Sequence, residues 1–146
     1  MKKAICFAVL VLVLLSCLTG CNFTKNVTGG LAGNAESTPK VEKMMIALAE
    51  NDASSAESLM HPQAIKKSKT AIEQMAGYLD GRKASSIELI NINVSSSVGT
   101  SGNVKQERVG YKATLVDGTV VYINAVNLSN KEGSGFASFQ LVLGLV

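Results

Sequence analysis

The side chain whose position says most about its chemistry is the thiol of Cys21. The chain opens with Met-Lys-Lys, followed by an uninterrupted apolar run of twelve residues from Ala4 to Leu15. A helix needs roughly 20 apolar residues to span a bilayer, so this run is too short for a membrane anchor. Together with Lys2 and Lys3 it predicts the core of an export signal. Cys21 then stands where an exported chain would be cut.

The motif Leu18-Thr19-Gly20-Cys21 resembles the lipobox of bacterial lipoproteins. In that family the cysteine thiol receives a diacylglycerol, a dedicated peptidase cuts just before the cysteine, and the new amino end is usually acylated as well. The resemblance implies a signal peptide over residues 1–20. It also implies a protein anchored by lipid to the cell membrane or the outer membrane, with its domain outside the cytoplasm and facing the periplasm in the outer-membrane case.

Lipid on Cys21 would anchor the protein to the membrane and would also leave the exported part without a free thiol. Burial of acyl chain contributes about 0.8 kcal/mol per methylene, so two or three chains hold a protein at the membrane almost permanently. Cys6 and Cys17, the other two cysteines, leave with the signal peptide. The exported part then has no disulfide, no cysteine metal ligand and no cysteine nucleophile. Its core alone must stabilise the fold.

Other candidate catalytic groups are sparse. His61 is the only histidine, and no carboxylate is placed by the sequence to orient it as a base. One histidine without a free thiol gives no spacing typical of a metal site, so we expect neither a metal nor a cofactor. Tyr78, Tyr111 and Tyr122 are hydrogen-bond donors that could line a pocket. The alternative for each tyrosine is a core position with a satisfied hydroxyl group.

Lys66, Lys67 and Lys69 form a cationic cluster with two interpretations. A lysine-rich helix face is commonly just solvated, whereas the functional alternative is contact with anionic headgroups, glycan or phosphate near the membrane. Without Lys2 and Lys3 the chain carries twelve basic and eleven acidic residues. This near-neutral balance excludes a nucleic acid as the expected partner.

The elements that must position these groups begin after a predicted flexible tether. Residues 21–37 are rich in Gly, Asn and Thr and have no apolar period, so we expect the folded domain over 38–146. Thr38 as a cap and Pro39 in the first turn predict a helix start. Further helices are predicted over residues 53–60 and up to a left-handed cap at Gly81. Their inward positions are Val41, Met44, Met45, Leu48, Ala56, Leu59, Met60, Ile72, Met75, Ala76 and Leu79.

From Ile90 onward the apolar period changes to two, which predicts antiparallel strands. Asp117-Gly118 predicts a two-residue hairpin turn. That turn would pair Ala113 with Tyr122 and place Tyr122 on the core face of the sheet. The neighbours expected on that face are Tyr111, Leu115, Val120, Val126 and Leu128. A last strand is expected from Phe136, with Ala137, Phe139, Leu141, Leu143 and Leu145 in one phase.

About three helices followed by about four strands predict an α+β fold, with the helices packed on one face of a curved antiparallel sheet. This order resembles the nuclear-transport-factor-like superfamily, also called cystatin-like, including its small bacterial lipoproteins of uncharacterised families. The likeness is carried by the helix pair over 40–61, the Asp117-Gly118 hairpin and the closing strand from Phe136. The resemblance implies that the curved sheet and the helices form a cone that encloses a pocket. Members of this superfamily include isomerases, dehydratases and non-catalytic binding modules.

We therefore expect a non-catalytic binding or interaction module, tethered to the membrane and recognising an unidentified protein or small molecule. One alternative is a small pocket enzyme of the isomerase or cyclase kind, for which an open cavity with a buried acid near a tyrosine would be the sign. The other is a structural or immunity-type partner protein, marked by a flat apolar patch on the exposed sheet face. An interior filled by side chains would favour the module. The side chains expected to fill it are Met44, Met45, Leu48, Ile72 and Phe139.

Removing the thiol should remove the anchor. The Cys21→Ala chain should remain uncut or appear in the soluble fraction, because no sulfur is left to accept the diacylglycerol. Cell fractionation with mass spectrometry of the amino end measures this, and Cys17→Ala is the matched control that should stay with the membrane. A Cys21→Ala protein that is correctly trimmed and still sediments with membranes would contradict the lipobox assignment.

Overall fold

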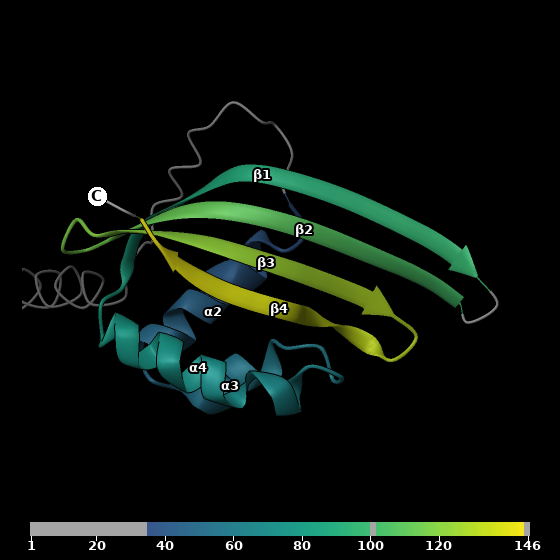
Figure 1. Ribbon diagram of the computed structural model, residues 1–146, viewed down its shortest axis with the longest axis horizontal. Coiled ribbons are helices and arrows are strands. Elements are labelled where there is room, and N and C mark those ends of the chain that lie inside the picture. Colours follow the sequence, from purple (N-terminus) through teal and green to yellow (C-terminus); the bar gives the residue numbers. More distant parts are fainter. Residues whose placement is uncertain (1–34, 100–101, 145–146) are drawn as a thin grey trace, which may run out of the picture.

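The computed structural model describes residues 35–99 and 102–144, which form three helices followed by a four-stranded antiparallel sheet (Figure 1). The helices are α2 (Thr38–Ala49), α3 (Ala53–Ser58) and α4 (Ile65–Leu79). The strands are β1 (Ala84–Gly99), β2 (Gly102–Leu115), β3 (Val120–Asn130) and β4 (Gly133–Leu143). They pair in chain order, which makes β1 and β4 the edges of the sheet. The predicted α+β class is confirmed.

Part of what the sequence predicts falls outside the described residues. The signal peptide over 1–20, Cys21 and the tether as far as residue 34 lie there. Ala35 and Ser37 belong to the segment predicted as tether, and both side chains are buried in the domain. Within the described residues no helix has the length and apolar character needed to cross a membrane.

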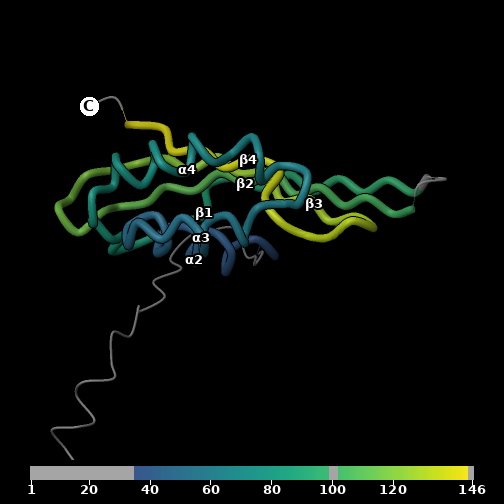
Figure 2. Tube along the Cα trace, turned by 90° about the horizontal axis from the view of Figure 1, so that it is seen from below, coloured from purple at the N-terminus to yellow at the C-terminus, as the bar shows by residue number. Residues whose placement is uncertain are grey.

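The core lies between the helices and one face of the sheet. In Figure 1, α2 passes behind the strands and α4 lies beside the β4 edge. Side chains from α2, α4 and the sheet meet there, and five of the expected core residues are at most 4% exposed. These are Met44, Met45, Leu48, Ile72 and Phe139. The space between helices and sheet is therefore filled by side chains. The outer ends of β1 and β2 extend past this helical layer (Figure 2).

The turn between β2 and β3 has three residues, not the predicted two. The Leu115 N–H donates to the Thr119 carbonyl at 2.8 Å, and the Gly118 N–H donates to the Leu115 carbonyl at 2.9 Å. Gly118 adopts a φ of +85°. A type I turn followed by a bulge needs a residue in this left-handed conformation, which glycine adopts easily. The Asp117 carboxylate accepts the Thr119 N–H at 2.9 Å, and this bond lowers the pKa of Asp117.

The extra turn residue shifts the strand register by one and reverses the predicted faces of β3. Ala113 lies opposite Val121, so the pairing predicted with Tyr122 is wrong. A shift of one residue moves every side chain of a strand to the other face. Val121 and Ile123 are accordingly buried in the core. Tyr122 points away from it and is 38% exposed.

A bulge in β4 corrects the phase predicted for the last strand. Phe136 pairs with Asn127 and Ser138 with Val126, which leaves Ala137 as the extra residue. Phe136 and Phe139 are three positions apart, yet both face the core, with ring centroids 5.2 Å apart. Ala137 is exposed instead of buried. The bulge therefore places a second aromatic ring in the core.

The segment between α3 and α4 covers part of the β4 edge. The Phe136 N–H donates to the Leu59 carbonyl and the His61 N–H to the Phe136 carbonyl, both at 2.9 Å. Met60 thereby forms a short parallel bridge with Phe136. Gly135 permits this approach, because a Cβ atom at that position would lie 2.6 Å from the Met60 carbonyl carbon and the His61 nitrogen.

Adding one methyl group at this contact should destabilise the fold. Gly135→Ala should lower the free energy of unfolding by about 1–3 kcal/mol, because the clash is with backbone that cannot rotate away. Chemical denaturation followed by circular dichroism measures the change. Gly77→Ala is the matched control, since no atom lies within 4 Å of its added Cβ. In the α4 interior it should raise the same free energy by about 0.5–1 kcal/mol. Equal effects of both variants would contradict the close-approach argument.

Candidate functional site

The three candidate tyrosines lie in three different places. Tyr111 is 1% exposed on the inner face of β2, and its hydroxyl lies 2.9 Å from the Thr38 hydroxyl. Burial raises the pKa of Tyr111, so its neutral form is favoured. Tyr122 is on the opposite face of the sheet. Tyr78 lies near the end of α4, where the Arg82 guanidinium is 5.0 Å from its ring centroid. The structure does not bring these hydroxyls together.

The buried acid among the described residues is Glu107, four residues before Tyr111 on β2. Its carboxylate is 3% exposed and accepts the backbone N–H groups of Glu36 at 3.0 Å and Ser37 at 2.9 Å. Both donors belong to the turn that opens α2. Ser37, the N-cap residue, makes no side-chain capping bond within the described chain. Glu107 therefore caps the helix from the sheet.

This arrangement corrects the predicted helix start. Thr38 was expected as the cap, but it is the first residue of α2, and its hydroxyl lies against the Tyr111 hydroxyl. Lys40 adds a link on the same helix, with Nζ 3.1 Å from Asn127 Oδ1 and 2.8 Å from Ser134 Oγ. The acid and tyrosine expected of a pocket enzyme thus occur near one another, but both are buried and bonded to α2. A catalytic carboxylate must instead reach a substrate.

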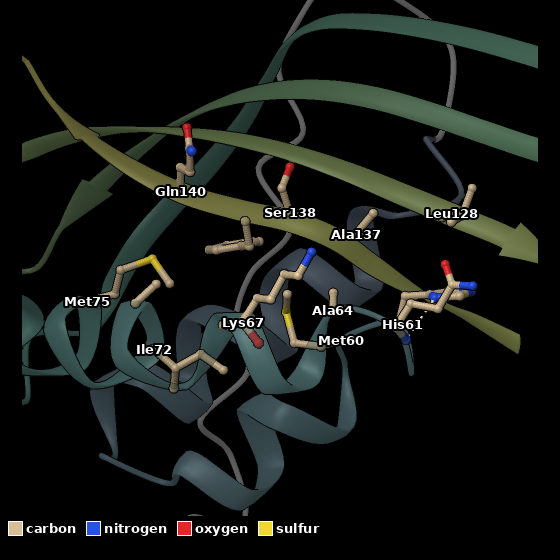
Figure 3. A pocket seen from close by; sticks show the side chains of 14 residues that line it. Met60, His61, Ala64, Lys67, Ile72, Met75, Leu128, Ala137, Ser138 and Gln140 are labelled. Carbon is tan, nitrogen blue, oxygen red and sulfur yellow. Dashed lines mark hydrogen bonds between the residues drawn. The ribbon is translucent and has the colours of Figure 1, made fainter.

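A groove of about 390 Å³ lies between α4 and β4 (Figure 3). Met60, Ile72 and Met75 line its helical side, and the β4 residues Ser138 and Gln140 line the opposite side. Leu128 of β3 lies at one end of the view. The remaining lining residues are His61, Gln63, Ala64, Lys67, Ser68, Ala71, Ala137 and Phe139. The wall is mainly apolar, with amide and hydroxyl groups along the strand.

The charge of the groove is set by Lys67. It is the one Lys or Arg among the fourteen described lining residues, and none of them is Asp or Glu. His61 is fully buried, with Nε2 3.1 Å from Asn130 Oδ1, while Nδ1 accepts the Gln63 N–H at 3.3 Å. The Asn130 oxygen also accepts the Glu132 N–H at 2.9 Å, which identifies it as the acceptor for the His61 ring. Both ring nitrogens are therefore engaged: Nε2 links the loop after α3 to the end of β3, and Nδ1 bonds within that loop.

The predicted lysine cluster is divided between surfaces. Lys67 lines the groove, whereas Lys69 faces α3 and lies 3.8 Å from Glu57. Lys66 is exposed and does not line the groove. Sequence reasoning found Lys67 but missed Ser138 and Gln140, because no local pattern indicates that β4 lies beside α4.

The described residues contain no group of three or more His, Cys, Asp or Glu side chains arranged to hold a metal ion. Comparison of the chain with models of known families, with curated proteins and with solved structures finds no match. The groove and its residues are thus the basis for assigning a function.

Removing one charge at the α2 cap should destabilise the fold. Glu107→Gln keeps the size of the side chain but replaces one acceptor oxygen by an N–H₂ group that faces a backbone donor. An unpaired buried donor costs about 1–3 kcal/mol, and the free energy of unfolding should fall by that amount. Urea denaturation measures it, with Glu73→Gln on the exposed face of α4 as the matched control. The control should change the value by less than about 0.5 kcal/mol. Equal stability of the two variants would show that Glu107 is not the cap.

Proposed function

We propose that the chain is a bacterial lipoprotein, cut after Gly20 and anchored through lipid on Cys21, whose α+β domain is a non-catalytic binding module. The cell membrane or outer membrane would then hold the domain outside the cytoplasm. The short apolar run and the lipobox-like motif support the anchoring. The groove between α4 and β4 is the proposed binding site.

The observation that carries the binding assignment is the composition of the groove. General acid–base catalysis commonly needs a carboxylate or histidine that is free to reach the substrate. The described lining has no Asp or Glu, and its histidine is bonded through both ring nitrogens. Apolar walls with a few polar groups are typical of ligand sites. Lys67 favours a small apolar ligand that carries an anionic group.

The filled core and the buried Glu107 support the same choice over a pocket enzyme. An enzyme of the isomerase kind needs an acid and a donor that converge on an open cavity. Here Glu107 and Tyr111 are 3% and 1% exposed, and both bond to the start of α2. Each oxygen of the Glu107 carboxylate already accepts a backbone N–H group, which favours a structural role.

We further propose that the domain has the fold of the nuclear-transport-factor-like superfamily. Its support is the element order, with helices preceding a sheet of consecutive antiparallel strands. The core on one face of the sheet fits the same family. The groove at the β4 edge would then be this chain's binding site, in place of the enclosed pocket implied by the resemblance.

Blocking the groove should remove binding of an apolar probe. Residues 22–146 include every core residue named above, and we expect them to bind the anionic dye 1-anilinonaphthalene-8-sulfonate. Ala71→Phe should weaken that affinity at least about tenfold, or about 1.4 kcal/mol, by filling the groove. Thr70→Phe is the matched control, because Thr70 is exposed on the same helix but does not line the groove. Fluorescence titration measures both affinities.

Lys67→Gln separates charge from apolar burial at the same site. It should weaken binding of the anionic dye about two- to fivefold, as an exposed ion pair would. Binding of the neutral dye N-phenyl-1-naphthylamine should not change. Equal dye binding by wild type, Ala71→Phe and Thr70→Phe would contradict the groove as the site, and circular dichroism checks that all variants are folded.

A further inference from the structure

The two edges of the sheet differ in how they are covered. At β4, Leu59 and His61 bond to both backbone groups of Phe136, and α4 lies alongside. At β1, the described residues 35–99 and 102–144 contribute no strand that pairs with its outer side. An edge strand presents a row of backbone donors and acceptors that can pair with another chain. Within the described part of the chain, the backbone groups on the outer edge of β1 therefore have no strand partner.

The outer half of β1 lacks the features that usually prevent such pairing. Proteins protect edges with charged side chains, proline or bulges. From Leu89 to Gly99 the sequence Leu-Ile-Asn-Ile-Asn-Val-Ser-Ser-Ser-Val-Gly contains neither charge nor proline. The bulge in this half of β1 lies between Leu89 and Asn91, so regular pairing with β2 runs without a shift over 91–99. The unprotected segment is thus 91–99.

This segment also exposes apolar side chains. Val94 is 52% exposed and Val98 is 84% exposed. Figures 1 and 2 agree that this part of β1 projects past the helices, so the helical layer does not cover it. Because side chains alternate along a strand, Ile92, Val94 and Val98 share one face, while Asn91, Asn93 and Ser95 share the other.

We propose that β1 pairs with β1 of a second copy of this chain, antiparallel and about a twofold axis at Ser95. Ser95 is the midpoint of 91–99, so this register pairs the whole unprotected segment. It places Ile92 opposite the second copy's Val98, which joins apolar side chains on one face. Asn93 then lies opposite Ser97, which joins polar side chains on the other.

The match of side chains in this register favours a second copy as the occupant, and the lack of charge in the segment does not oppose it. A twofold axis brings each side chain close to the same side chain of the other copy, and like charges placed opposite one another oppose pairing. The segment 91–99 contains no charged residue, so self-pairing meets no such repulsion. The result is a continuous eight-stranded sheet with the two groove sites at its far edges.

Disulfide trapping of the full chain in its native membrane tests both the partner and the register. Antiparallel pairing brings the two residues at the axis to about 4.5–5.5 Å between Cα atoms, within the range of a disulfide. Ser95→Cys should therefore give a disulfide-linked dimer on mild oxidation. The wild-type chain should not, because Cys6 and Cys17 leave with the proposed signal peptide and the Cys21 thiol carries the proposed lipid.

Ser97→Cys is the matched control on the same strand and face. In the proposed register its own copy lies four residues away, about 13 Å along the strand, which is too far for a disulfide. Val94→Lys added to Ser95→Cys should lower the dimer yield about tenfold, because it brings two lysines near the axis. Val94 is exposed, so circular dichroism should show an unchanged fold.

Three results would overturn the proposal. The first is a Ser95→Cys chain that stays monomeric under oxidation. The second is equal dimer yield from Ser95→Cys and Ser97→Cys, which would indicate random collision. The third is a Ser95→Cys disulfide to a protein other than this chain, which would assign the β1 edge to a different partner.

Discussion

The structure depends on the bond between the Glu107 carboxylate and the backbone at the start of α2. The sheet and the helix could otherwise slide across one another, since apolar contacts have little directional preference. A buried carboxylate that accepts two N–H groups has a defined position and orientation. Tyr111 and Lys40 fix the same end of α2 to β2, β3 and β4. With α2 fixed, the methionine-rich interior packs in one arrangement.

The groove follows from how β4 ends the sheet. The bulge at Ala137 turns Phe136 and Phe139 into the core, and the absence of a side chain at Gly135 lets the chain around Met60 approach. The loop after α3 is thereby held against the strand, and α4 starts next to the edge. Ser138 and Gln140 then line a groove beside α4 that the core side chains do not fill.

The distribution of polar groups separates binding from catalysis in this domain. Glu107, His61 and Tyr111 are the groups most suited to acid–base chemistry, and each is buried and bonded to structure. The groove retains Lys67 and neutral polar groups, which can orient a ligand but offer no carboxylate within the described lining. The β1 edge adds a second surface, remote from the groove, so ligand binding and self-association would not compete.

The sequence by itself determined the α+β class, the three helices and the inward residues of α2, because amphipathic periods are local. It did not determine the β2–β3 register, since one extra turn residue reversed Tyr122 and Val121. Tertiary structure alone decided that Glu107 caps a helix some 70 positions earlier in the chain. It also decided that Lys67 lies beside β4. Neither the Glu107 cap nor the Lys67 position produces a local sequence pattern. Contacts between residues distant in sequence form only when the whole core packs.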